Sequence, residues 1–369
     1  MIKSSPLSLK RQQRRISWPL AALSLLLTGL GVVMVYNASS VEAWREFGDK
    51  FHYVRSQLIW AAIGWGAALV VSRVDWRWLE KLALPVFVFN LCLLAAVLVP
   101  GLSRQALGAR RWLSVGSFSF QPSELVKLTF ALYLAAWLSR ERRRLVHFMA
   151  ILGLVIGLVI LEPDMGTALV IAFTALVVYF VAEQPLWHLV FLGISGVVAF
   201  SILALTSPYR RQRLLTFLNP TADPTGSSYH IRQVLLALGS GGLWGVGLGQ
   251  SRQKYAYLPE VTTDSIFAVF AEEVGFVGSL MLVLLFLLLV YQMIKIARLA
   301  PDKFSRLLAM GITAMIGGQI VLNLGAMVAL IPLTGLPLPF FSYGGSSLVV
   351  TLTGIGILLN ISRATVVKR

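Results

Sequence analysis

The residue best placed for chemistry is Asp264, which stands where a polar, glycine-rich stretch gives way to a long apolar run at 265–294. A carboxylate at the mouth of a hydrophobic helix is costly to bury, so an ionisable group kept there is a functional candidate. Arginine and lysine recur in the neighbouring polar segments, which favours a site acting on an anionic molecule. Asp264 is therefore the centre of our candidate site.

Basic residues form three groups in the polar segments of the chain. Each group suits phosphate or pyrophosphate, because the guanidinium of arginine presents a bidentate fork to such anions. Ordinary solvated surface charge is the alternative interpretation. The groups are Arg110 with Arg111, Arg210 with Arg211 and Arg213, and Arg252 with Lys254.

Glu124 and Lys127 open the apolar run at 122–139 and are three residues apart. This spacing places both side chains on one face of a helix. An ion pair within a membrane span is expensive unless it faces a polar cavity. The pair either lines a functional cavity or is purely structural.

Glu162 and Asp164 lie in a very short segment between two apolar runs. They could bind a divalent cation or a sugar, and helix capping by Asp164 is equally compatible with this position. Glu272 and Glu273 lie deeper in the run that follows Asp264, and we interpret them as structural.

The segment at 336–347 enters the last apolar run with rigid prolines, followed by hydroxyl groups and glycines. Ser342 and Ser346 belong to it. This composition predicts a shaped cavity wall and not an acid–base centre.

The composition identifies an all-α polytopic membrane protein, with 57% hydrophobic and only 13% charged residues. Soluble domains carry roughly 25% charged residues. Apolar stretches of the length a bilayer requires predict ten transmembrane helices. They lie at 18–36, 54–72, 83–100, 122–139, 145–161, 167–182, 186–206, 265–294, 307–331 and 345–361.

An even number of spans places both termini on one side of the membrane. Basic clusters gather on that same side, which the positive-inside rule identifies as cytoplasmic. We expect a basic N-terminal tail at 1–17, a single membrane domain at 18–361 and a C-terminal tail at 362–369.

The largest extracytoplasmic loop, at 207–264, lies between the seventh and eighth predicted spans. Loops of this length are usually functional. A short amphipathic helix is predicted at 230–238. The glycine-rich stretch at 239–249 favours a re-entrant or substrate-gripping loop over a merely flexible one.

Several classes of site are disfavoured. The net charge of +16 could indicate nucleic acid, but part of it orients membrane helices and the rest faces outward. The single cysteine, Cys92, provides no disulfide framework. The four histidines lack metal-ligand spacing.

Five motifs together resemble the SEDS family (shape, elongation, division and sporulation). They occur in the family's order and extend from the third predicted span to the C-terminus. The motifs are at 108–113, 121–124, 162–166, 258–264 and 337–347. The segments at 247–255 and 356–363 are more similar to the FtsW and SpoVE branch than to RodA.

The resemblance implies a peptidoglycan glycosyltransferase that polymerises lipid II at the outer membrane face during cell division. It implies a class B penicillin-binding protein as the transpeptidase partner, alongside other division proteins and membrane lipids. Asp264 matches the family's essential aspartate. The chain has Thr262 where histidine is common and Ser265 where phenylalanine is common, so the hydrogen bonding around Asp264 should differ.

We expect Asp264 to be the general base, with a pKa raised by partial desolvation. Glu162 and Asp164 are the candidate ligands for a divalent cation, Mg or Mn, and no other cofactor is expected. The expected substrate-binding residues are Arg110, Arg111, Glu124, Lys127, Arg210, Arg213, Lys254, Glu260, Ser342 and Ser346.

Two other functions remain compatible with the sequence. A flippase or transporter for a lipid-linked sugar would also need many spans and a polar cavity, although such proteins often show inverted repeats and none is evident here. A non-catalytic division scaffold would explain the hydrophobic surface but not Asp264 among outward-facing cations.

Overall fold

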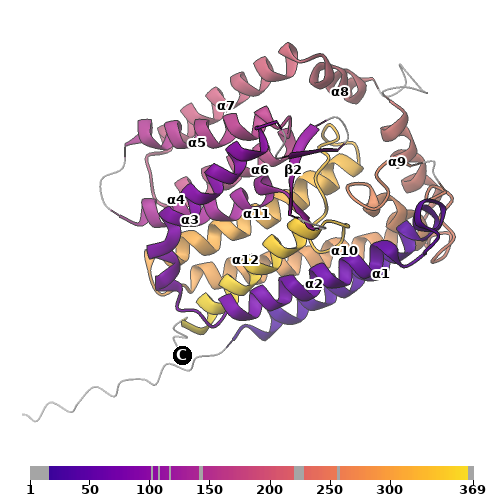
Figure 1. Ribbon diagram of the computed structural model, residues 1–369, viewed down its shortest axis with the longest axis horizontal. Helices are drawn as coiled ribbons and strands as arrows, with labels where there is room; N and C mark the ends of the chain where they lie inside the picture. The colour runs from indigo at the N-terminus through magenta and orange to yellow at the C-terminus, as the bar shows by residue number, and fades with distance from the viewer. Residues whose placement is uncertain are drawn as a thin grey trace, which may run out of the picture.

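The computed structural model describes residues 16–100, 103–106, 109–115, 118–140, 144–219, 228–255 and 258–364. Within these ranges, most of the long helices run in a common direction and form one elongated bundle (Figure 1). The helices are α1 (Trp18–Phe47), α2 (His52–Val71), α3 (Trp76–Val97), α4 (Pro122–Ser139), α5 (Leu145–Leu161), α6 (Met165–Val181), α7 (Leu186–Thr206), α8 (Pro208–Leu218), α9 (Tyr229–Ser240), α10 (Ile266–Arg298), α11 (Lys303–Met327) and α12 (Gly345–Ala364).

Each predicted apolar run overlaps one of the helices α1–α7 or α10–α12. In the described part of the chain, seven helices are long and apolar enough to cross a membrane, namely α1, α2, α3, α7, α10, α11 and α12. The apolar helices α5 and α6 are shorter, with 17 residues each. The chain is therefore a mostly helical, multi-pass membrane protein.

Several helices extend beyond the predicted boundaries. Helix α1 continues past the predicted end at 36 and stops at Gly48, whose left-handed conformation (φ 67°) is a common helix terminator. Helix α11 starts at Lys303, because Asp302 and Ser305 form a reciprocal capping box there.

Among the seven helices long and apolar enough to cross a membrane, α11 and α12 are the most enclosed, with 72% and 83% of their most apolar stretch buried, against 11% for α7. Helix α11 contacts α4, α6, α10 and α12. Close approach of α12 to α2 requires Gly356, because a Cβ atom there would lie 2.5 Å from the carbonyl oxygen of Ala68.

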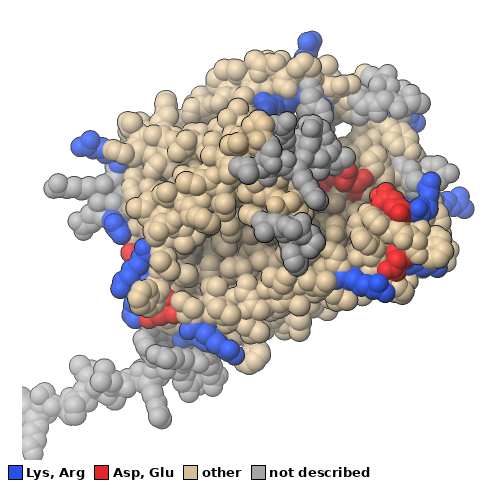
Figure 2. Space-filling model, viewed as in Figure 1, with Lys and Arg blue, Asp and Glu red and all other residues tan. Residues whose placement is uncertain are grey.

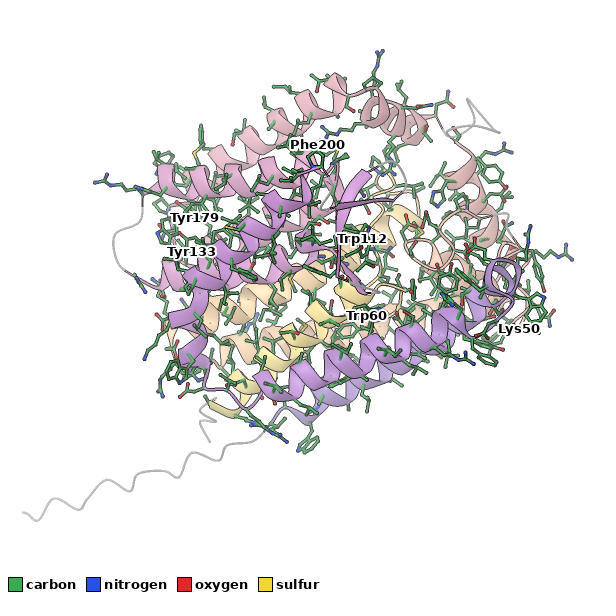
Figure 3. The ribbon with its side chains drawn as sticks, in the orientation of Figure 1. Lys50, Trp60, Trp112, Tyr133, Tyr179 and Phe200 are labelled. Carbon is green, nitrogen blue, oxygen red and sulfur yellow. The ribbon has the colours of Figure 1, made fainter. Side chains whose placement is uncertain are left out.

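Side chains fill the spaces between the helices (Figure 3). Tyr133 of α4 stacks on Phe87 of α3 with ring centroids 4.6 Å apart, and Tyr179 of α6 is fully buried. On the face shown in Figure 2, most charged side chains lie near the ends of the helices and uncharged residues cover most of the surface between them. This distribution is typical of a membrane protein.

A small antiparallel sheet corrects the all-α prediction. Its strands are β1 (Ser103–Ala106), β2 (Ala109–Val115) and β3 (Phe118–Phe120), in the order β1-β2-β3. The sequence analysis predicted no strand, because strands of three to seven residues give little alternation to detect. The consequence is that Arg110 and Arg111 lie on a hydrogen-bonded strand.

The segment at 207–264 has secondary structure of its own. It contains α8 and α9, and α9 confirms the short helix predicted at 230–238. The glycine-rich stretch that follows inserts its backbone into a break in α10 at Gly275, which has φ 70° and ψ −168°. Val246 N donates to Glu272 O at 3.0 Å, and Phe276 N donates to Gly242 O at 2.9 Å.

This insertion requires glycine. A Cβ atom on Gly245 would lie 2.1 Å from the carbonyl oxygen of Glu273, and Gly245 also has a positive φ of 81°. The glycine-rich stretch is therefore an ordered part of the fold, fixed to α10 through main-chain hydrogen bonds.

Candidate active site

Asp264 lies in a tight turn immediately before α10, and its side chain is almost fully buried. Thr263 N and Ser265 N both donate to the carbonyl oxygen of Glu260, at 3.2 Å each. Glu260 has a φ of 51°, a left-handed conformation that is uncommon for a non-glycine residue and often marks functional sites.

The turn is tied to two other parts of the fold. Tyr343 N donates to the carbonyl oxygen of Thr262 at 2.8 Å. Asn323 of α11 donates through Nδ2 to the carbonyl oxygen of Asp264 at 2.9 Å. The backbone of the turn is therefore held by α11 and by the segment before α12.

The carboxylate of Asp264 has little hydrogen-bond support. The one side-chain donor recorded for it is Thr263 Oγ1, at the long distance of 3.4 Å. Burial and the neighbouring Glu260 carboxylate raise its pKa to about 7, and the positive charge of Arg213 offsets part of this rise. Asp264 is therefore close to half-ionised at neutral pH, as a general base requires.

Glu124 and Lys127 form a buried ion pair, with Nζ 2.8 Å from Oε1. Lys127 also donates to Oε1 of Gln319 on α11 at 2.6 Å, whereas Glu124 Oε2 has no partner in the described part of the chain. Gln319 donates in turn to the carbonyl oxygen of Pro337 at 2.7 Å. The predicted i, i+3 pair thus connects α4 with α11 and the segment before α12.

Ser342 fixes the backbone of the segment before α12, and Ser346, in the first turn of α12, fixes the backbone just before α4. The hydroxyl of Ser342 accepts from Leu338 N at 2.8 Å, and that of Ser346 accepts from Gln121 N at 3.1 Å. Both side chains are buried, as in a shaped wall.

Arg111 clamps the turn between α5 and α6. Its Nε donates to the carbonyl oxygen of Glu162 at 2.7 Å, and its Nη2 donates to that of Pro163 at 2.6 Å. The side chain of Arg110 lies outside what the structure describes. Two nitrogens of the Arg111 guanidinium are therefore hydrogen-bonded to the backbone of the acidic turn.

The two acidic residues of this turn differ in their surroundings. Asp164 caps α6, accepting from Thr167 N at 3.0 Å and Thr167 Oγ1 at 2.8 Å, and it also accepts from Gln121. Glu162 is fully buried, and neither carboxylate oxygen has a partner among the described residues. Burial and the charge of Asp164 raise the pKa of Glu162 to about 8.

Whether this turn can bind a divalent cation depends on Glu162 and Asp164. No group of three or more His, Cys, Asp or Glu side chains that could hold a metal occurs in the described ranges. Mg²⁺ usually takes one or two carboxylates and keeps several waters. Glu162 has two uncommitted oxygens to offer, while those of Asp164 are largely used in capping.

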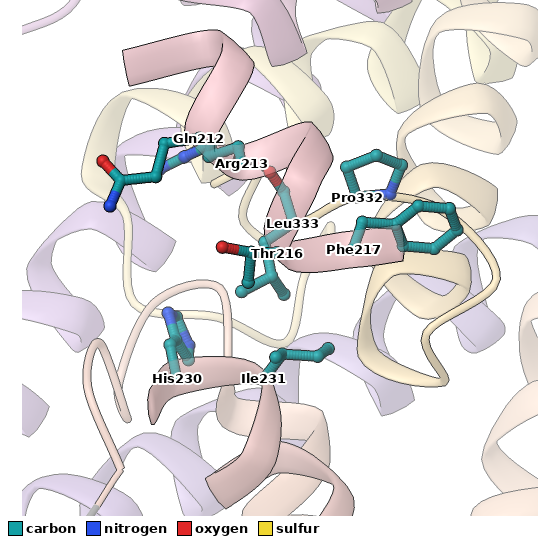
Figure 4. Close-up of a pocket in the computed structure, with 8 residues that line it drawn as sticks. All are labelled: Gln212, Arg213, Thr216, Phe217, His230, Ile231, Pro332 and Leu333. Atoms are coloured by element: carbon teal, nitrogen blue, oxygen red, sulfur yellow. Dashed lines mark hydrogen bonds between the residues drawn. The ribbon is translucent and has the colours of Figure 1, made fainter. Parts of the chain in front are cut away.

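Arg213 and His230 line a cavity of about 300 Å³ between α8, α9 and the segment before α12 (Figure 4). His230 lies 2.7 Å from the hydroxyl of Ser265, the residue after Asp264. Burial and the charge of Arg213 lower the pKa of His230 to about 4, so its imidazole is neutral at pH 7. The remaining lining residues are Gln212, Thr216, Phe217, Ile231, Pro332 and Leu333.

Arg213 and Arg210 also donate to backbone carbonyls. Arg213 Nη1 reaches Leu333 O at 3.0 Å, and Arg210 reaches Ile160 O at 3.4 Å. The positive charge of Arg213 acts on Asp264 and lowers the pKa of its carboxyl, against the larger effects of burial and Glu260.

Lys254 forms its contacts with α10 and α1. It is buried and pairs with Glu273 at 3.2 Å, and it also donates to Oδ1 of Asn37 on α1 at 3.0 Å. Lys254 thus belongs to the network that fixes the glycine-rich stretch to α10.

The sequence analysis missed Asn323, Gln319 and Asn37 as parts of these networks. Gln319 and Asn323 are uncharged amides inside an apolar run, and Asn37 directly follows the run at 18–36. The only available signal was the rarity of such a group in a membrane span.

The match to known proteins covers nearly the whole chain. Residues 18–366 fit the model of the FtsW, RodA and SpoVE family of cell cycle proteins. This chain belongs to that family. The SEDS resemblance is therefore confirmed.

Relatives in the FtsW, RodA and SpoVE family cover most of the chain. Stage V sporulation protein E of Bacillus subtilis is 44% identical over 93% of this chain and 96% of its own length. The probable peptidoglycan glycosyltransferase FtsW of Coxiella burnetii is 41% identical over 96% of this chain and 99% of its own. The two names are those of the predicted branch.

Solved structures of family members have the same fold. A chain of a peptidoglycan synthase complex that coordinates polymerization and crosslinking superposes with a TM-score of 0.77, at 34% identity, over 95% of this chain and 98% of its own. RodA of Thermus thermophilus superposes with a TM-score of 0.69, at 34% identity, over 95% of this chain and 97% of its own.

Proposed function

We propose that this family member is a peptidoglycan glycosyltransferase that polymerises lipid II into glycan strands for septal wall synthesis in cell division. The observation that carries the proposal is Asp264, a buried and poorly hydrogen-bonded carboxylate with a pKa of about 7, beside the charge of Arg213. Relatives named peptidoglycan glycosyltransferase, at about 40% identity over most of the chain, support it.

The reaction is a single in-line displacement that inverts the configuration at the donor sugar. The 4-hydroxyl oxygen of the acceptor sugar attacks the anomeric carbon of the donor, and the bond from that carbon to the lipid pyrophosphate breaks. Asp264 accepts the hydroxyl proton, and the lipid pyrophosphate leaves with the bonding electron pair. One base is sufficient, because pyrophosphate is a good leaving group once its charge is neutralised.

The charge of the leaving group is countered by arginine. Arg213 is the first candidate, because it already acts on Asp264 through its charge. Arg111 and Arg210 are further candidates, as is Arg110 on the same strand as Arg111. When bound at Glu162, a divalent cation, Mg or Mn, would supply additional positive charge to the pyrophosphate.

The remaining predicted substrate contacts have supporting roles in this proposal. The Glu124–Lys127 pair keeps a polar environment beside the lipid, and Glu260, Ser342 and Ser346 shape the wall around Asp264. Lys254 orders the glycine-rich stretch through Glu273.

In the membrane, ten helices cross the bilayer: α1–α7 and α10–α12. Both termini are cytoplasmic, because basic clusters accompany the connections on that side. The turn at Asp264 then faces the outside of the cytoplasmic membrane, as does the region containing α8 and α9. A class B penicillin-binding protein is the transpeptidase partner, as the related synthase complex that coordinates polymerization and crosslinking suggests.

The test is polymerisation of lipid II by purified protein, with a divalent cation and with or without the cognate transpeptidase. Asp264→Ala is the comparison variant. Glycan strands that form with the wild-type protein but not with Asp264→Ala would support the function and the role of Asp264. If neither protein forms strands, while labelled lipid crosses vesicles that contain the wild type, the chain is a transporter and the proposal fails.

A further inference from the structure

Asn323 lies near the end of α11, on the face directed at the turn before α10 and at the segment before α12. Its side chain is buried, with 1% of its surface exposed. An uncharged amide buried in an apolar span needs hydrogen-bond partners, because an unsatisfied polar group there is costly.

The amide group of Asn323 bridges two segments that are far apart in sequence. Nδ2 donates to the carbonyl oxygen of Asp264 at 2.9 Å and to that of Leu336 at 2.7 Å. A side-chain amide has two N–H donors, so both are used. The backbone of Asp264 is therefore fixed to α11 and to Leu336 by a single side chain.

Gln319, one turn earlier on the same face of α11, makes the parallel connection. It donates to the carbonyl oxygen of Pro337, next to Leu336, at 2.7 Å and accepts from Lys127 at 2.6 Å. Residues four apart lie on one helix face. Through these two amides, this face of α11 connects the Asp264 turn with the carbonyl of Leu336. It also connects the Glu124–Lys127 pair with the next carbonyl, that of Pro337.

We propose that Asn323 is a positioning residue for Asp264: it fixes the main chain that carries the base. The inference rests on the proposed function. Within the described ranges, the side-chain donor to the carboxylate is Thr263 at the long distance of 3.4 Å, so the location of the carboxylate depends largely on its own backbone. A displacement of about 1 Å in a reacting group can cost on the order of 100-fold in rate.

Asn360 of α12 provides a matched control. Its Nδ2 donates to the carbonyl oxygens of Val71, at 2.8 Å, and Val74, just after α2. It is also buried, and it makes the same kind of two-carbonyl bridge at a different place in the fold. Loss of this bridge should affect stability without affecting Asp264.

The experiment compares Asn323→Leu with Asn360→Leu, because leucine has a similar size and no donor. Purified proteins are assayed for kcat and KM in lipid II polymerisation and for melting temperature in detergent. We expect both variants to melt at lower temperature, since each removes two hydrogen bonds to main-chain carbonyls. For Asn323→Leu alone, kcat should fall on the order of 100-fold with KM nearly unchanged.

A second variant keeps the inference testable if Asn323→Leu does not fold. Asn323→Asp preserves the shape but loses the amide donors and adds a carboxyl group near Asp264. Besides a lower kcat, we expect the acid limb of the pH–rate profile to move to higher pH, because like charge raises the pKa of Asp264. The charged groups already acting on Asp264 are Glu260 and Arg213, and both are unchanged in this variant.

Failure of the inference differs from failure of the proposed function. If Asp264→Asn is inactive but Asn323→Leu loses no more kcat than Asn360→Leu, Asn323 is only structural and the inference is overturned. An unshifted acid limb with wild-type kcat in Asn323→Asp would overturn it equally. Wild-type polymerisation by Asp264→Asn would instead remove Asp264 as the base.

Discussion

Buried carboxylates lie in the N-terminal part of α10 and in the turn before it, and the two regions differ in the hydrogen-bond donors that they provide. Glu272 accepts from Ser251 Oγ at 2.5 Å and from Arg252 N at 3.2 Å. Glu273 accepts from Lys254, Ser251 N and Asn37. These two side chains have a nearly complete set of donors.

Asp264, in contrast, accepts one long side-chain hydrogen bond from the described residues, although its burial is similar. Donors to a buried carboxylate satisfy its oxygens and hold it in place, as a structural anchor requires. A carboxylate buried without donors keeps a pKa near neutrality and can accept a proton. The difference between the two regions therefore separates an anchor from a base.

The largest effect expected from this comparison concerns Asp264→Asn. The amide cannot accept the hydroxyl proton, so polymerisation should fall by about 1,000-fold, within the range for loss of a general base. The melting temperature should stay at or above that of the wild type, because no strong hydrogen bond is lost. A lipid II polymerisation assay together with a thermal melt in detergent checks both parts. A large drop in melting temperature would show that Asp264 is an anchor after all.

Glu273→Ala should have the opposite profile. Removing one member of a buried ion pair typically destabilises by about 4 kcal/mol, because the remaining Lys254 ammonium is left uncompensated. The double variant Glu273→Ala with Lys254→Met should recover part of the lost stability. Unfolding free energies of the two single variants and the double variant measure the coupling. Additive losses in this cycle would contradict an anchoring pair.

The local features of the site could be predicted from the sequence, whereas its long-range contacts could not. Asp264 at the start of an apolar run and the Glu124–Lys127 spacing are local patterns, and α9 also followed from local amphipathicity. The pairing of Lys254 with Asn37 joins residues 217 positions apart, and the contact of Asn323 with Asp264 joins residues 59 apart. No periodicity encodes which helices meet.

The break in α10 illustrates the same limit. Gly275 lies in a run whose composition predicts an uninterrupted helix, and its left-handed φ results from the backbone of the segment at 242–247. The glycine density of that segment did predict close backbone approach. The groups with which this segment pairs are the main-chain carbonyls of Glu272 and Glu273, and they could be identified only from the tertiary structure.

Glu162 extends the comparison to a second buried carboxylate with a raised pKa. Its pKa is raised from 4.5 to about 8, so stability is full below pH 4.5 and is lost as the pH rises toward 8. Glu162→Gln cannot ionise, and in EDTA it should be more stable than the wild type by about 3 kcal/mol near pH 7. Unfolding measured in EDTA from pH 4.5 to 8 checks this. Saturating Mg²⁺ should stabilise the wild type and not the variant if Glu162 binds the cation.

The smallest effect expected is the pH dependence of the wild-type protein. Because the base must be ionised, kcat should rise with pH up to about 7, and at pH 6 it should be about tenfold below its plateau. The pKa of Asp264 is raised from 3.8 to about 7, so its contribution to the stability of the fold decreases as the pH rises toward 7. Activity therefore increases over the same pH range in which this contribution decreases. His230, with a pKa near 4, cannot produce a limb near 7. If Glu162→Gln removes the limb, the titrating group is Glu162 and not Asp264. The assignment of Asp264 as the base would then be wrong.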